Sequence, residues 1–170
     1  MPLNSTSLTS PPAPVLMEHC CRQPWETYLE PLKMAPGVWY VSGNDWVACY
    51  LIDTGDGLIL IDTAMHETAY LMIENIRKLG YELTDIKKIL LSHAHIDHIG
   101  GCRTMKELTG AKVYLGKRDL IFLHERKDLI MNEGGYTCGE FEPDELYDDD
   151  KPIVQGNVTI HTVSTPGHTP

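Results

Sequence analysis

The segment Leu90-Leu91-Ser92-His93-Ala94-His95-Ile96-Asp97-His98-Ile99-Gly100-Gly101 places four potential metal ligands within six residues, directly after an apolar run typical of a buried strand. A chain that leaves a strand in extended form directs His93 and His95 to the same side, because side chains alternate along it. Asp97 and His98 then fall in the turn that leads into the next helix and face a neighbouring position. The spacing suits two metal ions held by one loop, each about 2.0–2.2 Å from its nitrogen or oxygen ligands.

The alternative interpretation is that these are solvated or core histidines without a common role. A single histidine is often of that kind. Several imidazoles crowded at one strand end, however, lose hydration without compensation unless a metal ion binds them. The pattern therefore predicts a metal site.

A second signal lies 70 residues after His98, in Ser164-Thr165-Pro166-Gly167-His168-Thr169-Pro170. An alternating segment before it predicts a strand that runs into this Pro-Gly turn. Proline and glycine favour a sharp turn, which would direct His168 back toward the first segment. His168 is then the third nitrogen ligand of a metal ion that already binds His93 and His95.

The rest of the chain predicts strands that alternate with helices. Three β-rich or apolar runs separated by turn residues predict a meander of strands. Apolar residues at three- and four-residue spacing predict a helix from His66 to Leu79, with Gly80 just past its end. This alternation indicates an α/β fold built in layers. The predicted strands are 38–41, 47–52, 58–61, 89–91, 112–115 and 158–164, and the predicted helices are 66–79, 102–109 and 117–129.

Residues 130–152 are rich in Gly, Glu and Asp and predict one long loop of the functional or mobile kind. Its acidic run, Asp148-Asp149-Asp150, is interpreted as a solvated loop tip in preference to a metal site. Tyr136, Phe141 and Tyr147 are the side chains of this loop that would line a substrate cleft.

The composition indicates one globular domain without a basic face. The chain has 170 residues, 42% of them hydrophobic and 22% charged, enough to bury a core. Its 14 Lys and Arg against 24 Asp and Glu give a net charge of −10, which argues against a nucleic-acid partner and against an RNA-processing nuclease. No run approaches the roughly 20 apolar residues that cross a bilayer, so we expect no membrane partner. A small-molecule substrate is the expected partner, and the sequence leaves the oligomeric state open.

The N-terminal residues and the cysteines bear on the cellular location. Residues 1–22 begin with a Ser/Thr/Pro-rich stretch that lacks the basic start and apolar centre of a signal peptide, and we interpret them as a flexible tail. We therefore expect a cytoplasmic protein, with secretion as the alternative. Reduced thiols agree with the five cysteines, which show no metal or disulfide spacing: Cys20, Cys21, Cys49, Cys102 and Cys138.

The two histidine-bearing segments together, HAHIDHIGG at 93–101 and TPGHTP at 165–170, resemble the metallo-β-lactamase superfamily. The likeness extends from about Pro31 to Pro170 and includes Leu60-Ile61-Asp62-Thr63, which resembles the first motif of the family. Within the superfamily, the sequence is most similar to the third metallo-β-lactamase subclass and its unclassified relatives.

This resemblance implies an α/β fold of the αββα sandwich type and a binuclear zinc site. It implies that His93, His95 and His168 hold one zinc ion, and that Asp97 and His98 help to hold a second. Asp62 would be a structural residue that supports the ligands rather than a ligand itself.

The sandwich of the superfamily consists of two similar halves, and its remaining ligands come from the second half. Here the chain stops two residues after His168, and the final histidine and the bridging aspartate of many relatives have no counterpart. We therefore expect residues 23–170 to form an incomplete metallo-β-lactamase-like domain, the N-terminal half plus the start of the second half. We also expect an uncovered apolar sheet face, which favours association or instability.

The resemblance further implies a zinc-dependent hydrolase. Two zinc ions about 3.5–4 Å apart share a water, a metal-bound hydroxide attacks the carbonyl carbon of an amide or ester bond, and zinc stabilises the oxyanion. Asp97 is the expected catalytic residue, because it would orient that hydroxide as well as bind metal. A β-lactam ring is the first expected substrate. The alternatives are a hydroxyacylglutathione-type thioesterase, an acyl-homoserine lactonase and, in another class, a catalytically inactive metal-binding fragment.

The other histidines and Cys102 are expected to have ordinary structural roles. His66 begins a predicted helix and His124 lies within one, so both are expected on the surface. His161 alternates with apolar neighbours and is expected to be half exposed. Cys102 follows Gly101 directly, and we expect it to pack within its helix rather than to approach the metal ions.

Overall fold

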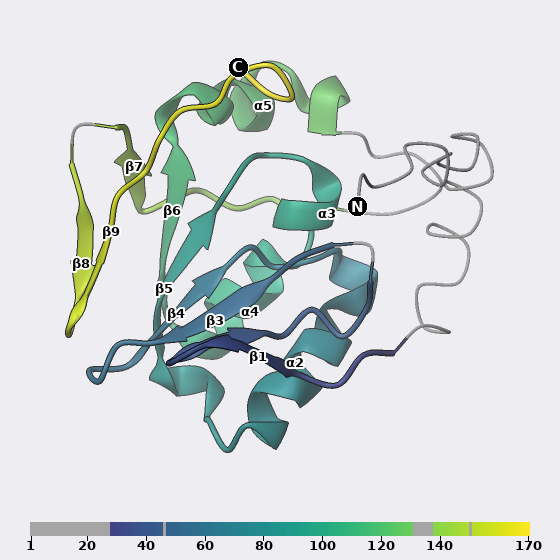
Figure 1. Ribbon diagram of the computed structural model, residues 1–170. Helices are drawn as coiled ribbons and strands as arrows, with labels where there is room; N and C mark the ends of the chain where they lie inside the picture. The colour runs from purple at the N-terminus through teal and green to yellow at the C-terminus, as the bar shows by residue number, and fades with distance from the viewer. Residues whose placement is uncertain (1–27, 46, 131–137, 150) are drawn as a thin grey trace, which may run out of the picture.

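The computed structural model describes residues 28–45, 47–130, 138–149 and 151–170 (Figure 1). The predicted tail at 1–22 lies outside these residues. Within them, seven strands form one sheet in which neighbours in space are also neighbours in sequence. These strands are β1 (Leu32–Ala35), β2 (Val38–Tyr40), β3 (Tyr50–Asp53), β4 (Leu58–Ile61), β5 (Ile86–Leu91), β6 (Lys112–Gly116) and β7 (Glu145–Tyr147).

The strands change direction at β4. β1 to β4 are joined by short connections and run antiparallel, whereas β4 to β7 run parallel. Parallel neighbours need a crossover connection, and the helices α2 (Ala69–Lys78) and α4 (Cys102–Thr109) supply two of them. The carboxyl ends of β4, β5 and β6 therefore lie side by side at one edge of the sheet. None of the helices in the described ranges is long enough to cross a bilayer, since the longest, α2, has 10 residues.

The predicted meander is confirmed as β2, β3 and β4, and the strands predicted at 89–91 and 112–115 are confirmed as β5 and β6. β1 was not predicted. All four of its residues are exposed, so no alternation of buried and exposed side chains marks it in the sequence.

Two of the three predicted helices are confirmed. The first begins as a 3₁₀ turn, η1 (His66–Thr68), and continues as α2, while α4 spans the predicted residues. A further 3₁₀ turn, η2 (Leu83–Asp85), precedes β5.

The third predicted helix, 117–129, is wrong as a continuous element. The carbonyl oxygen of Ile121 accepts hydrogen bonds from the N–H groups of both Glu125 and Arg126, and this shared acceptor ends the regular helical ladder. The segment is divided into η3 (Lys117–Asp119), α5 (Leu120–His124) and η4 (Lys127–Ile130).

The long loop predicted at 130–152 contains the strand β7, so that prediction is wrong in part. β7 pairs with β6, and the N–H of Asp144 donates to the carbonyl oxygen of Val113 at 2.8 Å. Asp148 and Asp149 are exposed, as predicted for a solvated loop tip, whereas Asp150 lies outside the described residues.

The strand predicted at 158–164 is too long. The observed strand, β9 (Val158–Ile160), pairs with β8 (Ile153–Gln155) in a separate two-stranded sheet. The first residue of β8 already lies opposite Ile160, so the ladder between these two strands ends there.

Alternate residues of the sheet build an apolar cluster on each face. On one face, Leu60 packs with Met72 of α2 and Met105 of α4 in the larger cluster. On the other face, Ile59 is buried together with Ile153 of β8, and Figure 1 shows β8 and β9 beside that part of the sheet. The chain thus has one helix-covered sheet and the first two strands of a further layer, which agrees with the predicted half of a sandwich.

The second face of the sheet is covered in part. Ile52, Ile61 and Tyr114 pack against the smaller cluster but remain partly exposed. The association or instability expected from this face stays a prediction.

The hairpin of β8 and β9 is fastened to the turn between β3 and β4. Its turn residue Gly156 has φ +51° and lies so close to the carbonyl oxygen of Thr54 that a Cβ atom there would overlap it. The N–H of Asn157 donates to the same oxygen at 2.9 Å, and the buried Gln155 side chain donates to carbonyl oxygens in and beside that turn at 3.2 and 3.3 Å. These contacts fix the direction in which the chain leaves β9 toward His168.

Candidate metal centre

The histidine pair lies in the turn between β5 and the short helix α3 (Ile96–Ile99). His95 is the residue before α3 and still has extended backbone angles, φ −91° and ψ 153°. The rings of His93 and His95 are 4.9 Å apart between centroids and nearly perpendicular. The two side chains thus lie together, as the strand geometry predicts.

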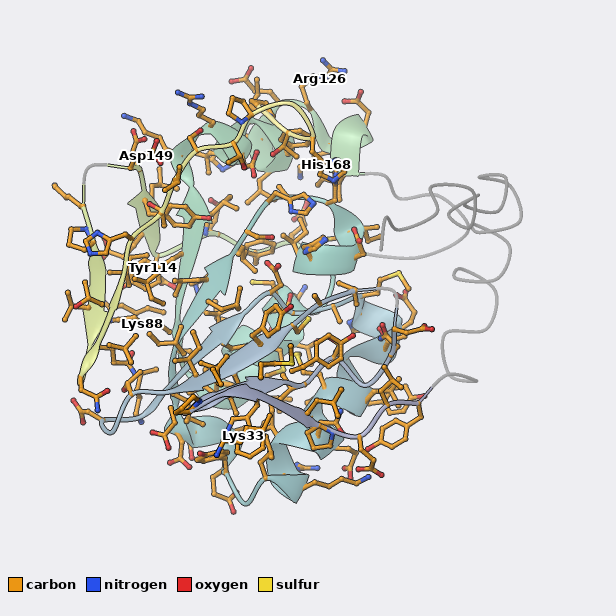
Figure 2. The ribbon with its side chains drawn as sticks, in the orientation of Figure 1. Lys33, Lys88, Tyr114, Arg126, Asp149 and His168 are labelled. Carbon is orange, nitrogen blue, oxygen red and sulfur yellow. The ribbon has the colours of Figure 1, made fainter. Side chains whose placement is uncertain are left out.

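His168 approaches this pair from a segment 73 residues further along the chain than His95. Nε2 of His168 lies 2.9 Å from Nδ1 of His95, and the ring centroids of His168 and His93 are 4.8 Å apart. One nitrogen from each of the three side chains lies within 4.8 Å of the others. Figure 2 shows His168 close above α3. The structure therefore brings together the three residues predicted to hold one metal ion.

A chain of hydrogen bonds sets the orientation of the His93 ring. The Ser92 hydroxyl donates to Oδ2 of Asp62 at 2.7 Å, so its own oxygen is the acceptor for N–H at Nδ1 of His93, 3.0 Å away. Nε2 of His93 then carries the lone pair. This atom is buried and has no hydrogen-bond partner among the described residues.

The electrostatics keep two of the clustered imidazoles neutral. Burial, followed by the neighbouring His98 and His95 rings, lowers the pKa of His93 to about 3. Burial and the proximity of His168 also lower the pKa of His95. Neutral imidazole is the form that binds a metal ion, so these shifts prepare the ligands for it.

The three histidines fit a zinc ion. An orphaned, buried lone pair on His93 is costly unless an electron-pair acceptor meets it. Three histidine nitrogens that leave a coordination position open are a donor set of catalytic zinc sites, and a hydrogen bond from the other ring nitrogen is the usual support for such a ligand.

Asp97 and His98, predicted to hold a second metal ion, lie on α3 beside this cluster. Nε2 of His98 is 3.3 Å from Oδ2 of Asp97, and Nδ1 of His98 is 2.8 Å from Oδ2 of Asp62. Burial alone would lower the pKa of His98, but these two carboxylates raise it to about 9. Without metal, His98 is thus an imidazolium between two carboxylates, and it stands outside the group of three convergent ligand nitrogens.

Asp62 lies directly after β4 and supports the turn without entering the cluster. Besides His98 and the Ser92 hydroxyl, it accepts the N–H of Ser92 at 2.7 Å through Oδ1. Its backbone has φ +59°, an uncommon value for a residue other than glycine. The adjacent Thr63 uses both its N–H and its hydroxyl to donate to the carbonyl oxygen of His98. These contacts agree with the structural role that the sequence implies for Asp62.

A cavity of about 380 Å³ adjoins the cluster and is lined by His93, His168 and Tyr147 among others. Tyr147 donates its hydroxyl to the carbonyl oxygen of Leu91, the last residue of β5, at 2.6 Å. The prediction that Tyr147 lines a cleft is confirmed. Phe141 packs against the larger apolar cluster and lines a separate cavity beside His124, so it does not share the cavity at the histidines. Tyr136 lies outside the described residues.

The other histidines of the described residues and Cys102 stand apart from the cluster. His66 and His124 are exposed, as predicted, and His124 contacts Glu142. His161 is exposed rather than half exposed, because β9 ends at the preceding residue. Cys102 is fully buried in the larger apolar cluster, as predicted.

The sequence matches a known family over residues 45–170, described as Metallo-beta-lactamase superfamily. The chain belongs to this superfamily. Among curated relatives, this chain is 31% identical over 128 residues to the uncharacterized protein YobT of Bacillus subtilis (strain 168). The match covers 73% of this chain and 54% of YobT. The chain is also 27% identical over 151 residues to an N-acyl homoserine lactonase of a Bacillus species. This match covers 73% of the chain and 55% of the lactonase.

Among solved structures, this chain is similar to BJP-1 of Bradyrhizobium japonicum, a subclass B3 metallo-β-lactamase. The two chains are 34% identical with a TM-score of 0.78, and the likeness covers 89% of this chain and 57% of BJP-1. The chain thus spans about half the length of the curated relatives and the structure that it matches. This finding supports the resemblance to the third subclass.

Sequence reasoning missed the role of Ser92 at this superfamily site. The hydroxyl links Asp62 to His93, residues that are brought together by the pairing of β4 with β5. The only signal in the sequence is a serine directly before the first histidine. That position does not indicate a role, because the partner of Ser92, Asp62, lies directly after the neighbouring strand and is known only from the fold.

Proposed function

We propose that the protein with this sequence is a zinc-dependent hydrolase that attacks the carbonyl of an amide or ester bond, with the β-lactam ring as its first substrate class. The convergence of His93, His95 and His168, with the orphaned Nε2 of His93 among them, is the observation that carries this proposal. A cytoplasmic location belongs to the same proposal and rests on the sequence alone.

The side chains of the site have distinct roles in this proposal. His93, His95 and His168 would hold one zinc ion, and Asp97 and His98 would contribute to a second. Zinc, when bound, supplies a Lewis acid that polarises a carbonyl oxygen and lowers the pKa of a water molecule. The Asp97 carboxylate is close enough to both His93 and His95 to raise their pKa values against the effect of burial, so it lies beside the proposed zinc ligands. Asp97 would orient that water and accept its proton.

The β-lactam ring is supported by the likeness to BJP-1, which combines 34% identity with coverage of 89% of this chain. The second candidate substrate is an N-acyl homoserine lactone, which is supported by 27% identity to a lactonase over 151 residues. Both reactions begin with attack on the carbonyl of a strained or activated ring, so the same residues serve either substrate. A thioester substrate and an inactive metal-binding fragment remain the further alternatives.

The test measures bound zinc and turnover in the same preparations. Zinc per chain is determined by mass spectrometry, and hydrolysis is followed with nitrocefin and with an N-acyl homoserine lactone. The variants are His95→Ala and, as a matched control, His124→Ala, which removes an exposed histidine outside the cluster.

Nitrocefin turnover that disappears in His95→Ala and persists in His124→Ala would support the β-lactam proposal. Turnover of the lactone with inactivity toward nitrocefin would replace the first substrate class by the second. Bound zinc without turnover of either substrate would favour the thioester or the inactive fragment. Absence of bound zinc from the wild-type chain would contradict the proposed hydrolase for these 170 residues.

A further inference from the structure

Two buried carboxylates, Asp62 and Asp119, flank the histidine pair, and only Asp62 has so far been given a role at the metal centre. Among the Asp and Glu side chains of the described residues, Asp62 and Asp119 are the two that are buried, with 3% and 5% exposure. Asp62 follows β4, and Asp119 is the last residue of η3, the turn that follows β6. The histidine pair follows β5, which lies between β4 and β6 in the sheet. The turn with His93 and His95 therefore has a buried carboxylate on each side.

Asp119 contacts both segments that deliver histidines to the cluster. Burial raises the pKa of the Asp119 carboxyl, and the Thr169 side chain and the backbone N–H of Ala94 oppose that rise. Thr169 is the residue after His168, and Ala94 lies between His93 and His95, so both segments present a donor to this carboxylate. Asp119 lines the same cavity as His93 and His168, and its Oδ1 is buried without a hydrogen-bond partner among the described residues.

We propose that Asp119 is a positioning residue that holds the His168 turn against the turn of His93 and His95, so that the three nitrogens meet at the distance a zinc ion requires. This inference rests on the proposed zinc site. A buried carboxylate with an unused acceptor is costly to maintain. The bridge that Asp119 makes between two segments 75 residues apart, at Ala94 and Thr169, offsets that cost only while both segments are in place. Asp62 orients the ring of His93 through Ser92, whereas Asp119 fixes the separation between the two ligand-bearing segments.

The experiment compares Asp119→Ala, which removes the bridge, with Asp119→Asn, which keeps one carbonyl acceptor of similar shape. Thr169→Val removes the hydroxyl on the far side of the bridge. Asp149→Ala is the matched control, because Asp149 lines the same cavity but is exposed. Figure 2 shows Asp149 well away from His168. The readouts are zinc affinity by chelator competition, the visible d–d spectrum of the Co²⁺-substituted chain, and the Tm of the metal-free chain.

Asp119→Ala is expected to weaken zinc binding roughly 10–100-fold and to change the Co²⁺ spectrum. Asp119→Asn is expected to keep most of the wild-type zinc affinity and Co²⁺ spectrum. Thr169→Val is expected to weaken zinc binding and change the spectrum less than Asp119→Ala does, and Asp149→Ala is expected to match the wild type. A residue that only stabilised the fold would lower the Tm of the metal-free chain and leave the Co²⁺ spectrum unchanged.

Wild-type zinc affinity and spectrum in a folded Asp119→Ala chain would overturn the inference. If that variant loses its cooperative thermal transition, Thr169→Val decides: an unchanged affinity and spectrum in that variant would equally overturn it. A wild-type chain that binds neither zinc nor Co²⁺ would instead overturn the proposed zinc site, because that result involves no substitution.

Discussion

The two segments that form the histidine cluster are held by the chain in different ways. The turn of His93 and His95 is held by Asp62 through two hydrogen bonds to Ser92, and α3 follows it directly. The segment 161–170 leaves a three-residue strand, and most of its residues are exposed, with Val163 at 78%. Within it, the N–H of Gly167 donates to the carbonyl oxygen of Thr169 at 2.9 Å.

This difference separates two properties of the molecule. The first turn is part of the hydrogen-bonded interior, so changes to its supports are expected to alter the free energy of unfolding. The second segment is placed by the β8–β9 hairpin and by side-chain contacts at its edges. Changes to those supports are expected to alter metal affinity more than folding, because local stability is lowest where few buried contacts hold the chain.

The largest expected effect is that of Asp62→Ala. The substitution leaves the Ser92 N–H and the His98 imidazolium without their buried acceptor, and loss of one partner of such a buried pair costs about 3–5 kcal/mol. Urea unfolding of the metal-free chain measures the change in free energy. Asp56→Ala, at an exposed carboxylate, is the control and is expected to stay within about 0.5 kcal/mol of wild type. Equal stability of the two variants would mean that the first turn is not held by Asp62.

The stability of the metal-free chain is expected to fall as pH rises from about 6.5 to about 9. His98 faces Asp62 from the loop after β4, Asp97 on its own helix, and the ring of His93, whose centroid is 3.9 Å away. Its folded pKa is raised to about 9, so its contribution is complete below the unfolded pKa and is lost as pH passes the folded one. The loss is on the order of 3 kcal/mol.

Thermal unfolding in EDTA at pH 6.5 and 9 measures this contribution. His98→Gln, which keeps a donor for Asp62 but no titrating group, is expected to show a weaker decline over the same interval. Parallel declines in the two proteins would assign the pH dependence to other groups.

The parts of the site that were predicted from sequence are those whose cause is local. Alternation along an extended chain suffices to bring His93 and His95 together, and a Pro-Gly turn suffices to suggest a reversal at His168. The bridge from Asp62 to Ser92 spans 30 residues and exists because β4 and β5 pair. Nothing in the spacing of these residues reveals such a contact.

The errors in the fold have the same origin. β7 exists because Glu145–Tyr147 finds a partner in β6. Its first two residues are exposed and only the last, Tyr147, is partly buried, so no alternation marks it as a strand. The predicted helix 117–129 is interrupted because the carbonyl oxygen of Ile121 accepts two N–H donors, those of Glu125 and Arg126, and the sequence pattern does not mark that point. β9 ends at Ile160, opposite the first residue of β8, so the partner strand sets its length.

Gly156→Ala is expected to move the hairpin and to weaken metal binding while the seven-stranded sheet stays folded. A Cβ atom at this position overlaps the carbonyl oxygen of Thr54, so the contact between hairpin and sheet must open, at a cost of about 1–3 kcal/mol. The expected loss of zinc affinity is about tenfold, which corresponds to about 1.4 kcal/mol.

Gly110→Ala is the matched control, because Gly110 also has a positive φ, +69°, but has no atom within 4 Å of an added Cβ. It introduces the same backbone strain in the loop after α4 without a clash. If Gly110→Ala weakens zinc binding as much as Gly156→Ala does, the effect comes from lost stability rather than from the hairpin. That result would contradict the claim that the β8–β9 hairpin places the His168 segment for metal binding.

The smallest expected effect is that of Thr162→Val. The Thr162 hydroxyl donates to the carbonyl oxygen of Asp148 at 3.2 Å, a contact between the His168 segment and the residue after β7. An exposed hydrogen bond of this kind contributes about 0.5–1.5 kcal/mol, and we expect its loss to appear as a twofold to tenfold weaker zinc affinity with an unchanged Tm of the metal-free chain. Chelator competition and thermal unfolding measure the two quantities. A fall in Tm without a change in affinity would show that the second segment is part of the folded interior as much as the first, because its supports would then act on folding and not on the metal site.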